Sequence, residues 1–311
     1  MDDPWHRWIT AERDGNDPEI ARRHTAGVVG ICERVVGAAN IGPGSSVADL
    51  GAGDGIAGFH VLAQTDPSTS VTFIEPSPGL LARIKSRAHE LDVAARCRFI
   101  NAPIESLSEI ADGSFDAVIM RAVLAYVPDK PAAFREIFRL LRPGGRLSMA
   151  DPVFQDRALA ITQMARGIES GLYGDRTREQ QLLHRWLATQ YPDTIDGILK
   201  NPLTNYNERH LVNMAAAAGF RPIRGWAEIE VKAVDPVPWE SFFHMAPFAG
   251  AGTLSDVFES LFDREEQIVF ERFIRERLEE RDRTEASVCA YLIAQRPPRP
   301  LFMNQGARPL V

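Results

Sequence analysis

The sequence predicts an α/β fold: a doubly wound, mostly parallel seven-stranded sheet with an antiparallel edge strand and helical cap insertions. Two observations lead to this fold. Short apolar runs alternate with helix-period segments over residues 47–151, which is typical of parallel strands joined by crossover helices. The first apolar run ends in VADLGAGDG, residues 47–55. A strand that feeds a glycine-rich turn and a helix places its ligand at the carboxyl ends of the strands.

The bulk composition narrows the class of protein. Of the 311 residues, 45% are apolar and 25% are charged, and no apolar run is long enough to span a bilayer. The N-terminal stretch is acidic and lacks the apolar segment of a secretory signal, so we expect a cytoplasmic protein. A net charge of −7 leaves no obvious basic surface for phosphates. This argues against a nucleic-acid partner and favours a small molecule.

The cysteines give no sign of a metal site. Cys32, Cys97 and Cys289 lie far apart and form no C-x-x-C pair. The sequence therefore indicates neither a zinc site nor a disulfide framework.

The elements of the alternating region follow in order. Residues 17–40 are expected to form a helix, because Asp17 is a favoured N-cap and Pro18 suits the first helical position. The stretch IGPGSS then ends this helix. The next elements are strand 47–50, helix 55–65, strand 71–75, helix 78–91, strands 97–101 and 115–121, helix 129–141, turn 142–145 and strand 146–151.

The alternation stops after Asp151. We expect an insertion over residues 152–206, then a helix over 207–219 that Gly219 ends, and a strand over 220–234. A second insertion over 236–285 and a final strand over 287–295 would follow. The last two strands would close the sheet as an antiparallel pair. Within the second insertion, an amphipathic helix is predicted from apolar residues at helical spacing, namely Ile268, Val269, Phe270, Phe273, Ile274 and Leu278.

We expect one ligand-binding core with cap segments around it. The core would comprise residues 41–151, 207–235 and 286–296. The N-terminal helical segment and the two insertions would wall the pocket, over residues 1–40, 152–206 and 236–285. A proline-rich tail, 297–311, is expected to be mobile.

The residues between the glycines distinguish the possible ligands of the turn. A dinucleotide requires G-x-G-x-x-G, but Ile56 stands at the third glycine position. Asp49 and Asp54 would also repel a pyrophosphate. A triphosphate would require Gly-Lys-Ser/Thr, which is missing. S-adenosylmethionine suits the turn, since its ammonium and sulfonium favour carboxylates and it carries no phosphate.

Further residues have the chemistry that this ligand needs. Asp49 can accept from the ammonium, and the start of the following helix offers N–H groups to the methionine carboxylate. Glu75 ends the second strand, where a carboxylate can accept hydrogen bonds from both ribose hydroxyls.

The sequence resembles the class I S-adenosylmethionine-dependent methyltransferases in VADLGAGDG, in FIEPS and in GSFDAVIMRAVLAYVPDKPAAFREIFRLLRPGGRL. It is most similar to the branch of ubiquinone/menaquinone-biosynthesis and small-molecule natural-product methyltransferases. The resemblance covers residues 25–151, and it is weaker over 205–235 and 287–295. It implies a Rossmann-like methyltransferase fold with S-adenosyl-L-methionine as cofactor.

The resemblance also implies a cofactor site. The methionine part would be held by Asp49, Gly51, Ala52, Gly53 and Gly55. Ribose and adenine would be held by Glu75, Pro76 and the backbone N–H of Ile104, and the sulfonium would be lined by the backbone of Arg121 and Ala122. The family often has an aspartate for the adenine amino group where this chain has Pro103, and Glu105 is a possible substitute.

A base is needed only where the methyl acceptor must lose a proton. The candidates for this base, or for orienting the acceptor, are Tyr126, Asp151, His24 and His244. Histidines occur in or beside the predicted cap segments also at positions 6, 184 and 210. Aromatic residues of the cap segments are candidates for the pocket wall, namely Trp5, Trp8, Tyr173, Trp186, Tyr191, Tyr206, Trp239, Phe242 and Phe243.

The predicted function is methyl transfer to an oxygen or nitrogen of a small, aromatic or peptide-like secondary metabolite. Carbon methylation of an aromatic or quinone-like molecule is the alternative, followed by a non-catalytic cofactor-binding protein. Ile56 disfavours a nicotinamide oxidoreductase. Metal-dependent catechol methylation is disfavoured because the stretch MRAVLAY holds no carboxylate. We expect a monomer or homodimer.

Overall fold

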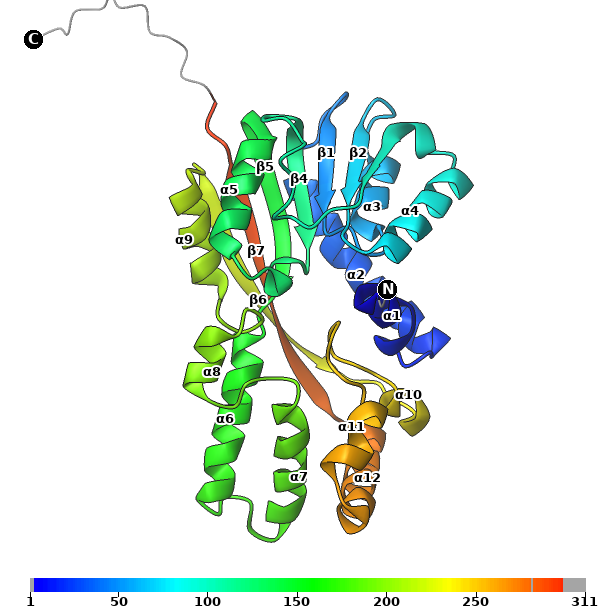
Figure 1. Ribbon diagram of the computed structural model, residues 1–311, viewed down its shortest axis with the longest axis vertical. Coiled ribbons are helices and arrows are strands. Elements are labelled where there is room, and N and C mark those ends of the chain that lie inside the picture. Colours follow the sequence, from blue (N-terminus) through cyan, green and yellow to red (C-terminus); the bar gives the residue numbers. More distant parts are fainter. Residues whose placement is uncertain (1–2, 281, 299–311) are drawn as a thin grey trace, which may run out of the picture.

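The computed structural model describes residues 3–280 and 282–298. Most of the predicted tail, 297–311, therefore lies outside the described residues. The strands are β1 (Ser46–Leu50), β2 (Ser70–Ile74), β3 (Cys97–Ile100), β4 (Phe115–Arg121), β5 (Leu141–Pro152), β6 (Ile223–Ala233) and β7 (Thr284–Gln295). They form one sheet in the order β3-β2-β1-β4-β5-β7-β6, in which β7 pairs antiparallel with both β5 and β6 (Figure 1). The predicted seven-stranded, mostly parallel sheet with an antiparallel edge is confirmed.

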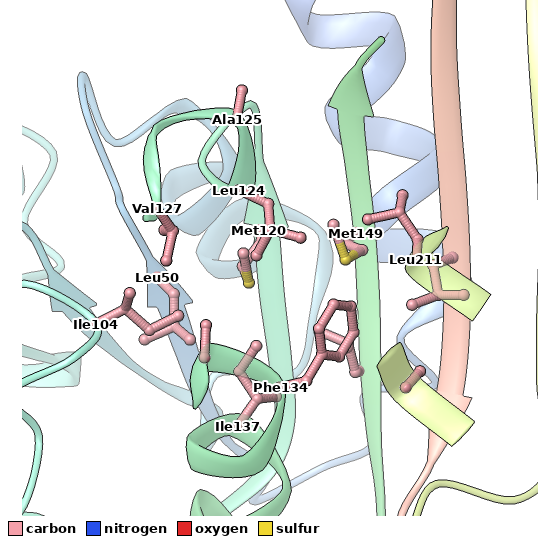
Figure 2. Packing of buried hydrophobic residues seen from close by; sticks show 14 of the residues in the cluster. Leu50, Ile104, Met120, Leu124, Ala125, Val127, Phe134, Ile137, Met149 and Leu211 are labelled. Carbon is pink, nitrogen blue, oxygen red and sulfur yellow. The ribbon is translucent and has the colours of Figure 1, made fainter. Parts of the chain in front are cut away.

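Helices cover both faces of the sheet. The helices α2 (Pro18–Ala38), α3 (Ile56–Gln64) and α4 (Pro78–Glu90) pack on one face. The helices α5 (Lys130–Leu140) and α9 (Glu208–Ala218) pack on the other, over a cluster that includes Met120, Phe134 and Met149 (Figure 2). Short helical turns complete this half of the molecule: α1 (Pro4–Arg7), η1 (Trp8–Glu12), η2 (Ala94–Arg96) and η3 (Leu124–Tyr126).

Local signals place the helix ends close to their predicted positions. The Asp17 carboxylate accepts hydrogen bonds from the backbone N–H groups of Glu19 and Ile20, at 2.9 and 3.2 Å, and so caps α2. Gly219 follows α9 with φ of +104°, a conformation that glycine adopts at little cost.

The starts of three strands differ from the prediction by three residues or more, and one of them is β7, which begins at Thr284 rather than at residue 287. Residues 142–145, expected as a turn, lie within β5 but bulge from it, because the pairing with β4 shifts between Phe115 and Ala117. Strand β6 begins at Ile223 rather than Phe220, whose ring is buried against Phe138.

The two insertions form a second, mainly helical region below the sheet in Figure 1. The first contains α6 (Gln155–Glu169), η4 (Gly174–Arg176), α7 (Thr177–Ala188) and α8 (Ile195–Lys200), and the second contains α10 (Trp239–Phe243), α11 (Leu254–Leu261) and α12 (Arg264–Glu279). The ends of β6 and β7 extend beyond β5 into this region as a two-stranded ribbon.

Both insertions contribute to one apolar cluster. Leu182 and Leu183 of α7 pack with Phe258 of α11 and Phe270 of α12. Glu266 of α12 also accepts hydrogen bonds from two arginines of α7, Arg178 at 2.8 Å and Arg185 at 2.7 Å. Segments that are far apart in the sequence therefore share one core.

The predicted amphipathic helix is α12. Phe270, Phe273, Ile274 and Leu278 are buried as expected, but Ile268 is 61% exposed and takes no part in the buried face.

None of the helices in the part of the chain that the structure describes has the length and apolar character needed to cross a bilayer.

Candidate active site

A cavity of about 310 Å³ lies at the carboxyl ends of β1, β2 and β4. The glycine-rich turn after β1 and the turns after β2 and β4 form its walls. This is the edge of a doubly wound sheet at which ligands bind, and its position agrees with the prediction. Of the predicted cofactor residues, those that line the cavity are Gly51, Gly53, Glu75, Pro76, Ile104, Arg121 and Ala122.

The glycine-rich turn needs its glycines for both conformation and space. Gly51, Gly53 and Gly55 have φ of +63°, +58° and +77°. A Cβ atom at position 51 would lie 2.5 Å from a methyl carbon of Val123, in the turn after β4. Gly55 does not line the cavity but stands at the N-cap of α3. The turn thus brings backbone close to the cavity without side chains.

Asp49 lies beneath this turn rather than in the cavity wall. It is 2% exposed, and its carboxylate accepts a hydrogen bond from the backbone N–H of Gly58 at 2.9 Å. Burial raises the pKa of Asp49 to about 7, against the opposing effect of the Gly58 hydrogen bond and of the nearby Arg121 charge. Ala52, also predicted, is buried outside the cavity lining.

Glu75 joins the turns after β1 and β2. Its carboxylate accepts from the backbone N–H of Gly53 at 2.8 Å and from that of Ser77 at 2.9 Å. The residue is 4% exposed yet lines the cavity, and burial raises its pKa above the usual range. The side chain of Asn101 donates to the carbonyl oxygens of Glu75 and Pro76, both at 2.9 Å. This fixes the turn that carries the carboxylate.

The loop after β3 lines the cavity through Ala102, Pro103, Ile104 and Glu105. Ile104 and Glu105, which were considered for the adenine, therefore both line the cavity. Across the cavity, Ala122 has φ of +55°, so its backbone turns sharply where β4 ends.

The N-terminal segment closes the cavity on a further side, through Trp5, Trp8, Ile9 and Arg13. Asp3 accepts hydrogen bonds from the hydroxyl of Ser77 at 2.7 Å and from the backbone N–H of Gly79 at 3.2 Å. The Trp8 indole donates to the carbonyl of Ala246 at 2.9 Å. Ile9 and Arg13 were not predicted to line the cavity, because only the two tryptophans of this acidic stretch are a signal in the sequence.

The four candidates for acid–base or orienting roles lie in different surroundings. Tyr126 lines the cavity, and its ring packs edge-on against Trp5 with 4.7 Å between ring centres. Burial raises its pKa well above that of a free phenol. His24 lines the cavity too, with its Nδ1 3.0 Å from the carboxylate of Asp14. Asp14 was missed by the sequence analysis, because nothing local marks it.

The other two candidates do not line this cavity. His244 is exposed on the second insertion, with Nδ1 3.2 Å from the hydroxyl of Ser255. Asp151 is fully buried, and its carboxylate accepts from the backbone N–H groups of Val123, Leu124 and Ala125 at 3.4, 3.3 and 3.2 Å. Burial raises its pKa to about 6, although these hydrogen bonds oppose the shift. Asp151 thus contacts backbone of the turn that lines the cavity.

Most of the aromatic residues considered for the pocket wall lie elsewhere. Trp186, Trp239, Phe242 and Phe243 pack against the apolar cluster that the two insertions share, while Tyr191 and Tyr206 belong to the core cluster beside the sheet. Tyr173 packs against Gly167 of α6. Among the nine, only Trp5 and Trp8 line the cavity.

The residues present fit S-adenosylmethionine. The turn forms a cradle that a Cβ at position 51 would fill, and the buried carboxylate of Glu75 lines the same cavity and has the chemistry to accept hydrogen bonds from ribose hydroxyls. Within residues 3–280 and 282–298, no three histidine, cysteine or carboxylate side chains are grouped so that they could hold a metal ion.

Comparison with known proteins gives a consistent result. Residues 41–191 match the family of methyltransferase domains. The chain is 31% identical over 189 residues to a ubiquinone biosynthesis O-methyltransferase of Xanthomonas campestris, covering 57% of this chain and 76% of that protein. It is 41% identical over 125 residues to an arsenite methyltransferase of Aquipseudomonas alcaligenes, covering 38% of this chain. The chain spans 35% of that relative's length.

Among solved structures, the YcgJ protein of Bacillus subtilis is similar with a TM-score of 0.54 and 15% identity. The match covers 88% of this chain and 99% of that one. At this identity the likeness supports the fold.

Proposed function

We propose, from the premise that this chain belongs to the class I S-adenosylmethionine-dependent methyltransferases, that it methylates a hydroxyl oxygen or an amine nitrogen of a small, aromatic or peptide-like metabolite. Its cofactor is S-adenosylmethionine. The observation that supports the proposal most is the single cavity in which the glycine turn, Glu75 and the N-terminal tryptophans meet.

When bound, the cofactor supplies an electrophilic methyl group, so the protein has mainly to align the acceptor and exclude water. We assign Glu75 to the ribose hydroxyls and the backbone of the glycine turn to the methionine carboxylate. Ile104 and Glu105 would face the adenine. The buried Asp49 would act on the ammonium through its charge or through water.

The acceptor would lie under the N-terminal segment. Trp5 and Tyr126 present aromatic surface there, and aromatic side chains hold flat acceptors and favour a nearby cation. His24 is the candidate that lines the cavity and can take a proton, so we prefer it to His244 as the base. Asp151 would act indirectly, by holding the turn that contains Tyr126.

An oxygen acceptor is supported by the name of the ubiquinone relative, and a nitrogen acceptor would use the same cavity. Carbon methylation remains the second candidate. We also propose the predicted division of the chain into a ligand-binding core and cap segments. For its biology, we propose a role in natural product biosynthesis and a cytoplasmic location. We propose that the protein is a monomer or homodimer and has no nucleic-acid partner.

The first test is calorimetric titration with S-adenosylmethionine, S-adenosylhomocysteine and NADH. Binding of the two adenosyl compounds without NADH supports the proposal, and binding of NADH alone overturns it. Transfer of a labelled methyl group to a panel of phenols, aryl amines, small peptides and quinols then identifies the acceptor atom. If methyl transfer to none of the panel exceeds that of the Glu75→Ala variant, the acceptor class is wrong.

A further inference from the structure

Asp14 and His24 form a pair at the edge of the cofactor cavity. The Asp14 carboxylate lies 3.0 Å from Nδ1 of His24, and Asp14 is only 6% exposed. His24 lines the cofactor cavity and also a second cavity of about 360 Å³ between α2 and the β6–β7 ribbon. His24 therefore borders both cavities, with 38% of its side chain exposed.

The position of Asp14 is fixed from several sides. Arg13 contacts the Asp14 carboxylate at 3.1 Å and reaches Asp54 of the glycine turn at 3.5 Å. A Cβ at Gly15 would lie 2.1 Å from the carbonyl oxygen of Ser241, so the backbone of Gly15 packs closely against α10. Burial tends to raise the pKa of Asp14, but the hydrogen bond with His24 and the Arg13 charge outweigh it and lower the pKa. Asp14 is thus a fixed carboxylate at neutral pH.

A carboxylate can only accept a hydrogen bond, so a neutral His24 must carry its proton on Nδ1. Its Nε2 then has a free lone pair, and among the described residues this atom has no hydrogen-bond partner. An imidazole held in this tautomer is ready to take a proton at Nε2.

We propose that Asp14 is a positioning residue that fixes His24 as the proton acceptor for a substrate hydroxyl entering from the second cavity. This inference rests on the proposed function and narrows its acceptor to a phenol or another ionisable hydroxyl. In the step, the acceptor O–H bond breaks, its proton forms an N–H bond on Nε2, and the electron pair left on oxygen bonds the methyl carbon. The bound cofactor would supply that methyl group by loss of its bond to sulfur, whose electron pair would stay on sulfur, so that S-adenosylhomocysteine would leave. Arg13 links this pair to the glycine turn through Asp54.

A purely structural role for Asp14 would be to attach the N-terminal segment to α2. Asp3 offers a matched comparison, because it attaches the same segment at Ser77 and Gly79 and makes no hydrogen bond with His24. Loss of either residue would loosen the N-terminal segment, but only loss of Asp14 would change the tautomer of the His24 imidazole.

The experiment is long-range ¹H–¹⁵N spectroscopy of histidine-labelled full-length protein at a pH where imidazole is neutral. His24→Ala identifies the His24 signals. We expect the Nδ1–H tautomer in the wild type, in Asp3→Ala and in Asp14→Asn, whose amide oxygen still accepts. In Asp14→Ala we expect a shift toward the Nε2–H tautomer, which imidazole side chains favour in water. An Nε2–H tautomer in the wild type, or no change in Asp14→Ala, would overturn the role of Asp14.

Calorimetry with S-adenosylhomocysteine on the same samples keeps the two proposals apart. Intact binding together with an unchanged tautomer overturns only the inference about Asp14. Absence of binding in the wild type overturns the proposed function, whatever the tautomer. With the phenol found by the acceptor panel, Asp14→Ala should lower kcat about tenfold or more with little change in KM, and Asp14→Asn should restore part of it.

Discussion

The carboxylate of Asp151 accepts a hydrogen bond from the hydroxyl of Tyr206, with 3.3 Å between the two oxygens. The same hydroxyl lies 2.9 Å from the carbonyl oxygen of Pro152, and Lys130 sits over the Tyr206 ring at 4.8 Å. Because Asp151 also holds the backbone of residues 123–125, this buried group connects the first insertion to the cavity wall.

Replacing Tyr206 with Phe should therefore destabilise the fold modestly and leave the cofactor site in place. The change removes the hydroxyl contacts with Asp151 and Pro152, so we expect a loss of about 0.5–1.5 kcal/mol in the free energy of unfolding. Urea denaturation measures this change in the free energy of unfolding. A Tyr191→Phe variant is the control, since Tyr191 belongs to the same core but its hydroxyl makes no hydrogen bond to Asp151. Equal losses in both variants would contradict the specific contact.

Asp151 should make stability depend on pH. Its pKa is raised by burial to about 6, so the folded state holds the proton more tightly than the unfolded chain. The stabilisation from that proton is complete below the unfolded pKa of about 3.8 and is lost as pH rises through about 6. An Asp151→Asn variant cannot titrate here. The stability of the wild type relative to this variant should fall between pH 4 and 7, and a constant difference would show that Asp151 does not titrate in this range.

Glu75→Ala should weaken binding of S-adenosylhomocysteine by about 1–3 kcal/mol, because a charge-assisted hydrogen bond to the ribose is lost. Calorimetry measures the affinity. Glu90→Ala is the control, since Glu90 is exposed at the end of α4. An unchanged affinity in Glu75→Ala would show that Glu75 does not bind the ribose.

Gly51→Ala should damage the site more than the same change at Gly44. Both glycines have positive φ, +63° and +71°, so both variants bear a backbone strain of about 1–2 kcal/mol. Only at Gly51 would the new Cβ meet Val123, at 2.5 Å, whereas nothing lies within 4 Å of a Cβ at Gly44. We expect Gly51→Ala to lose most of its cofactor affinity and Gly44→Ala to retain it. Similar affinities would mean that the turn is free to move away from β4.

Cofactor binding should release protons near neutral pH. The Asp49 pKa of about 7 leaves this carboxyl half protonated at pH 7, and a bound cation nearby would favour the ionised form. We therefore expect release of up to about half a proton per S-adenosylmethionine bound at pH 7, declining at higher pH. Calorimetry in buffers with different ionisation enthalpies measures this release. It should be reduced in Asp49→Asn, and equal release in that variant would assign the proton to another group.

The part of the cavity that we assign to the cofactor could be predicted from the sequence because its signals are local. Strand, turn and helix start are consecutive, so the spacing of Gly51, Gly53 and Gly55 determines the backbone path, and Glu75 follows from the end of the next parallel strand. The helix caps at Asp17 and Gly219 were equally local. These features depend on the backbone conformation of a few consecutive residues, and the types of those residues are enough to predict it.

The part of the cavity that we propose for the acceptor depends on the tertiary structure. Aromatic residues such as Trp186 and Trp239 look alike in sequence whether they line a pocket or pack in a core, and both pack against the apolar cluster that the two insertions share. Burial decided that Asp151 holds backbone rather than facing the cavity, because a desolvated carboxylate needs donors. Trp5 meets Tyr126, and Asp14 meets His24, only because the N-terminal segment folds back across the sheet edge. Such contacts depend on how separate elements pack, and no local pattern in the sequence specifies them.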